Sequence, residues 1–366
     1  MSFESGSVSF RMLYVPRALP PDAVARFAQH AAPPINTLGT DMIHGWVTGR
    51  HLLDRNITED TAMHGGYLRL TLMQAERKIP EALLRAECRM EELAHIQAQG
   101  LDRISQSTRR EIRESITKRL LPTMPPTLKG IALLYDPRSR LLYTSALSDK
   151  QLDAFQIGVS LALGFGGVPV LPETAALQRK KTSIKDWSAC SYSPEVEDED
   201  VTADPGLDFF TWLWFAAETR GGMFKLEKLG DWGVMIEGPL TFVREGAGAH
   251  ETVVRRGEPL VSAEAKAALV SGKKLRRAKL TLARGDLAFS CTFEAPAFAV
   301  RSLKLPEGEK LDALSKFQER MTFVDLFKEA LLSLFDRFVE ERLDAKKWKA
   351  TRAEIHTWVT ERKTRG

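Results

Sequence analysis

The sequence has few cysteines, little net charge and no long hydrophobic run. Only Cys88, Cys190 and Cys291 occur in 366 residues, and three widely spaced cysteines exclude a disulfide framework and a zinc ribbon. No stretch approaches the roughly 18 uninterrupted apolar residues of a membrane-spanning helix. Met1–Phe10 has no basic segment followed by an apolar core, so we expect no secretory signal. These absences favour a cytoplasmic protein.

The small net charge of +4 hides a strong segregation of charge along the chain. Basic residues outnumber acidic ones by nine to four over 101–140, by nine to three over 251–285 and by seven to two over 345–366. Residues 186–208 contain eight acidic residues and no basic one. Segregation of this kind can steer a polyanion toward one part of a protein surface.

The hydrophobic pattern predicts an α+β protein with mainly antiparallel sheets and helices packed on them. We expect an N-terminal region over 1–185, with strands at 7–15 and 67–73, charged helices within 80–121, a hairpin over 130–146 and a helix at 149–163. An acidic linker over 186–206 follows. The C-terminal region, 207–344, is expected to hold a buried helix at 207–217, short strands at 233–237 and 240–243, a basic hairpin over 273–293 and a long helix at 321–343. A basic helical tail covers 345–366.

Catalytic motifs are almost absent, so we expect a protein that is not an enzyme and that needs no cofactor. The seven histidines show no paired metal-ligand spacing. One fragment, Glu264-Ala265-Lys266, has the E-x-K form that some metal-dependent nucleases use beside a Mg²⁺ ligand. It falls in an expected helix, whereas such nucleases place it at a strand edge. A metal-dependent nuclease and a protein-interaction scaffold remain as alternative functions.

Two basic clusters point instead to nucleic acid. In the helix near 107–121, Ile112 and Ile116 belong to an apolar stripe, and arginines follow its edge. In the strand near 273–283, Ala278, Leu280 and Leu282 share one face while basic residues share the other. Such faces suit a phosphate backbone and read no bases. The candidate DNA-binding residues are Arg109, Arg110, Arg113, Lys118, Arg119, Lys273, Lys274, Arg276, Arg277 and Lys279.

Several segments, in consistent order along most of the chain, resemble the recombination-associated RdgC family of bacteria. They are the His-Gly-Trp-Val stretch at 44–47, Ala-Glu-Arg-Lys-Ile-Pro at 75–80, Leu-Leu-Pro at 120–122, Gly-Val-Pro-Val-Leu-Pro at 167–172, Thr-Trp-Leu-Trp at 211–214, and Gly272-Lys273 followed by Arg277 and Leu280.

The resemblance implies a DNA-binding protein without enzymatic activity that forms a ring-shaped homodimer. Duplex DNA, or single-stranded DNA, would pass through a basic central opening without regard to sequence. The protein would associate with the nucleoid and hinder RecA filaments. On this view the basic residues of the helix 109–119 and of the strand 273–279 line the ring. The acidic stretch 195–204 and the basic tail look like additions, and the tail either binds DNA or keeps the C-terminus soluble.

Overall fold

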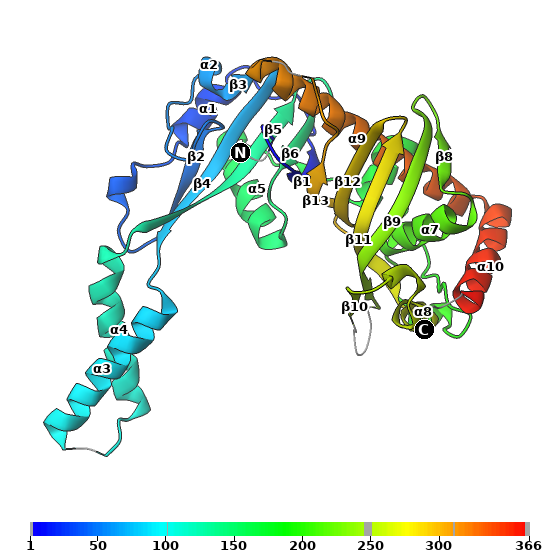
Figure 1. Ribbon diagram of the computed structural model, residues 1–366. Coiled ribbons are helices and arrows are strands. Elements are labelled where there is room, and N and C mark those ends of the chain that lie inside the picture. The colour runs from blue at the N-terminus through cyan, green and yellow to red at the C-terminus, as the bar shows by residue number, and fades with distance from the viewer. Residues whose placement is uncertain (1–2, 101, 245–250, 310–311, 363–366) are drawn as a thin grey trace.

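The chain folds into two lobes and a projecting arm (Figure 1). The computed structural model describes residues 3–100, 102–244, 251–309 and 312–362. Helices and one large antiparallel sheet make up the molecule, which confirms the expected α+β class. The lobes lie side by side, and the arm descends from the N-terminal lobe, so that the chain outlines an open arch (Figure 1).

A single sheet of 13 strands runs through both lobes. Strand β1 joins its two halves, because it pairs on one side with β13 and on the other with β6, both antiparallel. The expected boundaries at 185 and 206 stay a prediction. The main path, in spatial order, is β10 (Thr252–Val254), β9 (Gly230–Val243), β11 (Lys274–Arg284), β12 (Leu287–Glu294), β13 (Ala299–Lys304), β1 (Val8–Tyr14), β6 (Leu141–Thr144), β5 (Pro126–Asp136), β4 (Tyr67–Arg77) and β2 (Ile43–Thr48). Three short strands lie off this path, namely β3 (Met63–His64), β7 (Val168–Pro169) and β8 (Met223–Leu226).

In the N-terminal lobe the sheet is covered on both faces. Leu70 and Leu72 of β4 belong to the core formed with α1 (Ala23–Gln29) and α5 (Asp149–Leu163). Tyr67 and Tyr143 belong to a second core, which includes Met321 of the long helix α9 (Ala313–Leu343). Helix α2 (Glu59–Ala62) contacts β3 and β4, whereas α6 (Pro172–Lys180) contacts α9 and α7 (Pro205–Thr219). The strands predicted at 7–15 and 67–73 are present as β1 and β4. The hairpin predicted over 130–146 is formed by β5 and β6, and the helix predicted at 149–163 is α5.

The arm is a pair of helices with a small core of its own. Helix α3 (Glu81–Gln99) follows Pro80 and ends at Gly100, whose φ of 62° is the left-handed conformation that glycine adopts readily. Helix α4 (Gln106–Leu120) begins at Ser105, whose side chain accepts a hydrogen bond from the Thr108 amide. Ile112 and Ile116 pack with Leu84 between the two helices. The apolar stripe read from the sequence is thus the seam of the arm.

In the C-terminal lobe one face of the sheet is buried and the other is open. Helix α7 (Pro205–Thr219) is buried along most of its length against β9, β11 and α9. Helix α10 (Ala345–Glu361) packs against α7, and α8 (Ala263–Val270) packs against α10. The two short strands expected at 233–237 and 240–243 form one strand, β9, which continues through Gly238-Pro239.

The acidic segment 186–206 does not run through open solvent. Tyr192 and Ser193 are buried, and the Tyr192 hydroxyl donates to the backbone carbonyl of Asp208 at 3.1 Å. Asp198 is ion-paired with Arg352 of α10. The high charge of this segment indicated a solvated linker, but arginine partners and interleaved apolar residues hold it on the C-terminal lobe. Within the described residues, no helix has the length and apolar character needed to cross a membrane.

Candidate nucleic-acid interface

The open face of the C-terminal sheet is basic. Ala278, Leu280 and Leu282 of β11 are fully buried, whereas Arg277 and Lys279 alternate with them and are partly exposed. The predicted division of this strand into an apolar and a basic face is therefore correct. In Figure 1, β11 and β12 lie on the side of the lobe nearest the arm, and α7 and α10 lie on the far side. The basic face thus looks into the space under the arch.

Three arginines on this face converge on one carboxylate. Arg276 and Arg277 reach Oε1 of Glu294 at 3.2 and 3.3 Å, and Arg301 reaches Oε2 through Nε at 3.2 Å and through a terminal nitrogen at 3.0 Å. Burial by itself would raise the pKa of Glu294, but Arg277, Arg301 and Arg276 outweigh it and hold that pKa below its usual value. Glu294 is therefore ionised at neutral pH, and three positive charges surround one negative charge.

The two lysines beside this cluster have single polar partners. Lys279 lies 2.7 Å from a carboxylate oxygen of Glu237 on the neighbouring strand β9. Lys273, which precedes β11, donates to the Thr252 hydroxyl at 2.6 Å. Both side chains stay partly exposed. Because partly exposed ion pairs and hydrogen bonds contribute little free energy, a phosphate oxygen can replace these partners.

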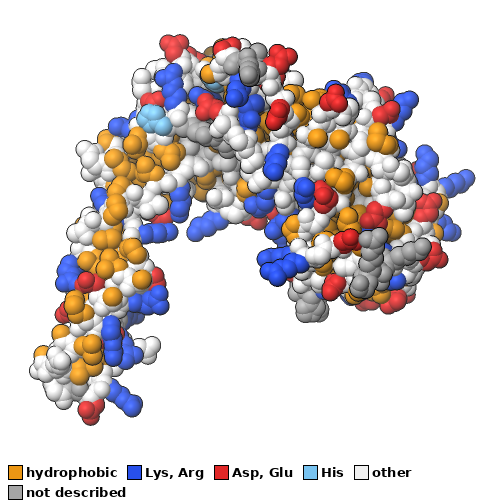
Figure 2. Space-filling view, in the orientation of Figure 1, with side chains coloured by type: hydrophobic (Ala, Val, Ile, Leu, Met, Phe, Trp, Pro, Cys, Tyr) orange, Lys and Arg blue, Asp and Glu red, His pale blue; other side chains and the backbone are white. Residues whose placement is uncertain are grey.

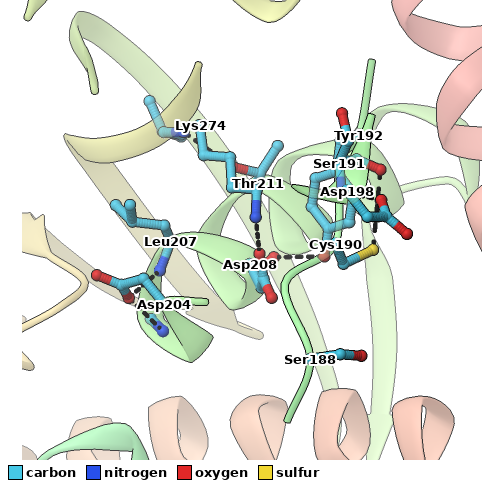
Figure 3. A network of polar contacts seen from close by, with 12 residues as sticks. Ser188, Cys190, Ser191, Tyr192, Asp198, Asp204, Leu207, Asp208, Thr211 and Lys274 are labelled. Atoms are coloured by element: carbon cyan, nitrogen blue, oxygen red, sulfur yellow. Dashed lines mark hydrogen bonds and ion pairs between the residues drawn. The ribbon is translucent and has the colours of Figure 1, made fainter. Parts of the chain in front are cut away.

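Lys274 needs a correction, because it is buried and faces away from the arch. Its ammonium is ion-paired with Oδ1 of Asp208, and the side chains are 4% and 2% exposed. Oδ2 of Asp208 accepts a hydrogen bond from Arg342 at 2.9 Å. The region around this pair is shown in Figure 3, where Asp208 and Thr211 of α7 lie beside the start of β11. Lys274 balances an acid of the apolar helix α7 and cannot reach DNA from this position.

The arm carries the second basic cluster. Arg109, Arg113 and Arg119 are each more than half exposed and face glutamates of α3, while Arg110 pairs with Glu114 one turn along α4. Lys118 is exposed. Figure 2 shows Lys and Arg side chains along the edge of the arm that faces the C-terminal lobe, with open space between the two. The two predicted clusters therefore do not touch within one chain, but both border the same space.

A model of a protein family described as "Putative exonuclease, RdgC" matches residues 22–195. This region, a little less than half of the chain, is similar to the RdgC family. The resemblance read from the sequence is thereby confirmed, and it supports a recombination-related role in association with nucleic acid. The comparison with curated proteins finds no match.

The RdgC match covers the arm and most of the N-terminal lobe, but it ends before the basic hairpin. The arginines and lysines of β11 and β13 therefore lie outside the matched residues. The case for a role of these residues in DNA binding rests on their positions in the structure and not on the family match. Arg301 was not among the candidates from the sequence. Two polar residues separate Val300 from Leu303, so β13 lacks the period-two alternation that identifies a strand in a sequence.

The fragment proposed for a nuclease lies in α8, as its sequence context indicated. The Lys266 ammonium donates to the backbone carbonyl of Arg362 at 3.1 Å, which fixes it to the end of α10. In the described parts of the chain, no group of three or more His, Cys, Asp or Glu side chains is arranged to hold a metal ion. Glu264 therefore belongs to no such group among the described residues.

Proposed function

We propose that this chain binds duplex DNA through its phosphate backbone, without reading sequence, and does so as a homodimer that encircles the duplex. In this role it would associate with the nucleoid and limit the activity of RecA filaments during recombination. The proposal is carried by the basic residues of β11 and β13, on the side of the C-terminal lobe nearest the arm (Figure 1), together with the Lys and Arg side chains along the arm (Figure 2).

The chemistry of this face suits backbone binding. The basic side chains of this face project from the strands of a sheet. Among the described residues, neither this sheet nor α4 forms a helix-turn-helix or another motif that reads bases. Lysine and arginine side chains that neutralise phosphates release counterions, which supplies affinity that is independent of sequence. Such binding is strongly weakened by salt.

The homodimer is supported by an exposed apolar row on the arm. Leu83, Met90 and Leu93 of α3 are 37%, 57% and 44% exposed, and their spacing places them on one side of the helix. An exposed apolar row on a projecting element is typical of a protein–protein interface. A second copy that meets the first through the arms would close the open side of the arch.

Salt-titrated mobility shifts with a charge-reversal pair test DNA binding. Arg277→Glu with Lys279→Glu should weaken binding to all duplex sequences alike and flatten the dependence of affinity on salt. The matched control is Lys225→Glu with Arg337→Glu, which reverses the same charge on exposed residues of β8 and α9, in the C-terminal lobe but away from β11. Equal loss in both double variants, or loss confined to one DNA sequence, would contradict the proposal. If the unmodified protein does not retain DNA at moderate ionic strength, the proposal of DNA binding fails and the protein-interaction scaffold becomes the better interpretation.

The family description names an exonuclease, so cleavage needs its own test. We propose that the chain binds DNA without cutting it. End-labelled linear DNA incubated with the protein and Mg²⁺ or Mn²⁺ should stay intact over many binding half-lives. Shortened products that disappear in Glu264→Gln would establish the nuclease alternative. Products that persist in this variant would place cleavage at another site.

A further inference from the structure

The arginine cluster around Glu294 has the exposure pattern of a binding site. The Glu294 side chain is 9% exposed, whereas those of Arg276, Arg277 and Arg301 are 39%, 38% and 34% exposed. The carboxylate is therefore less accessible than the three arginine side chains around it, and Nε of both Arg276 and Arg277 is buried without a hydrogen-bond partner among the described residues. Each guanidinium carries five N–H donors, and the hydrogen bonds described for Arg276 and Arg277 at Glu294 use one donor each.

We propose that Arg276, Arg277 and Arg301 form one binding site for a phosphate group of the nucleic-acid backbone, with Glu294 as the positioning residue that holds them together. This inference rests on the DNA binding proposed above. Guanidinium groups bind phosphate oxygens through paired N–H donors, and such charge-assisted bonds are stronger than neutral ones. All three groups already reach a single carboxylate, so they converge on a volume small enough for one phosphate.

Glu294 is needed because three like charges at this distance repel one another. The arginines come from two strands, β11 and β13, that flank β12, and Glu294 of β12 lies between them. Arg301 also lies 3.5 Å from the backbone carbonyl of Leu147, just before α5, so the site sits where the two lobes meet. Without the carboxylate the guanidinium groups would separate, and a phosphate would have to gather them at the cost of side-chain entropy.

The decisive variant is Glu294→Gln. An effect of net charge on DNA affinity and the loss of the carboxylate that holds the arginines together predict opposite results for it. The substitution makes the protein more basic, so charge alone predicts tighter DNA binding and a steeper salt dependence. Positioning predicts weaker duplex binding, by roughly tenfold at fixed salt. Urea unfolding of the same variant shows whether it is folded at the temperature of the assay. Tighter or unchanged binding by folded Glu294→Gln would overturn the role of Glu294.

Substitutions of Arg301 test the site independently of Glu294. Arg301→Gln should weaken duplex binding by roughly tenfold and lower the log–log salt slope by about 0.9, the value for one lost phosphate contact. Arg301→Lys should restore the slope but not the full affinity, since lysine keeps the charge and lacks the paired donors. Arg337→Gln, which removes an exposed arginine of α9, is the matched control and should change neither.

The outcomes separate this site from the general proposal. If Arg277→Glu with Lys279→Glu abolishes binding while Arg301→Gln and Glu294→Gln do not weaken it, DNA binding stands and the phosphate site is wrong. If the charge-reversal pair has no effect, both proposals fail. Full affinity and slope in Arg301→Gln would by themselves remove Arg301 from the site.

Discussion

Arg352 of the basic tail is ion-paired with Asp198 of the acidic segment. A nitrogen of the same guanidinium lies 3.3 Å from the backbone carbonyl of Ser191, and His356 on the next turn of α10 contacts that carbonyl as well. Two segments with opposite and extreme charge therefore meet on one side of the C-terminal lobe. In Figure 1, α10 lies on the side of this lobe that faces away from the arm.

This pairing predicts that the tail contributes little to DNA binding. Replacing Lys346, Lys347 and Lys349 together by glutamine should leave duplex affinity within about twofold and the salt slope unchanged, because these lysines lie on α10, away from the arch. Salt-titrated mobility shifts measure both quantities. The matched triple variant is Arg109→Gln, Arg110→Gln and Arg113→Gln on α4, which removes the same charge from the arm and should flatten the slope. A flatter slope in the tail variant would mean that α10 binds DNA.

The ion pair between Asp208 and Lys274 predicts a large effect on stability. Asp208→Asn leaves Lys274 and Arg342 as two buried cations without a counter-charge, and removing one partner of a buried pair costs about 3–5 kcal/mol of unfolding free energy. Urea unfolding followed by circular dichroism measures this loss. Lys273→Gln, at the adjacent, partly exposed position, should change stability by less than about 0.5 kcal/mol. A similar small effect for Asp208→Asn would show that the pair is not important for the fold.

Lys274 and Lys279 show how far a sequence pattern can predict a functional face. Period-two alternation correctly separates Lys279 from Leu280, because side chains of a strand point to opposite faces and only one face is buried here. The same run of basic residues includes Lys274, whose partner Asp208 lies 66 positions earlier in the sequence. A contact of this range depends on how α7 packs on β11, which local pattern does not contain. Composition therefore places the basic strand correctly but cannot tell which of its lysines is internal.

The absence of Arg301 from the candidates and the expectation of a linker over 186–206 have related reasons. Strand β13 has six residues and pairs with β12, which directly precedes it, and with β1, which comes from the opposite end of the chain. The acidic segment is charged enough to indicate a solvated linker, yet Tyr192 is buried in the core and Arg352 pairs with Asp198. Helices such as α3 and α4 were predictable, because their apolar stripe and their ends are local features.

The pKa of Glu294 predicts a pH dependence of stability. Burial would raise this pKa, but Arg277, Arg301 and Arg276 hold it below the ordinary value. A carboxyl whose pKa is lowered by folding stabilises the folded state fully above the ordinary glutamate pKa of about 4.3, and this contribution is lost as pH falls through the lower folded value. Urea midpoints should therefore fall more steeply with acidification in the unmodified protein than in Glu294→Gln. Parallel curves would show that the arginines do not stabilise the ionised carboxylate.

The apolar row on α3 predicts the surface that joins two copies. Met90→Glu with Leu93→Glu places like charges on that row, and charged groups facing each other across an interface without partners are costly to desolvate. Sedimentation equilibrium should show a dimer for the unmodified protein and a shift toward monomer for this variant, by at least tenfold in dissociation constant. Met223→Glu, a substitution of an equally exposed methionine on β8, is the control and should leave the dimer intact. If the arm variant becomes monomeric, it should also lose any preference for linear duplex over closed circles, because a ring threads onto free ends and an open arch does not need them. A variant that stays dimeric would place the interface on another surface.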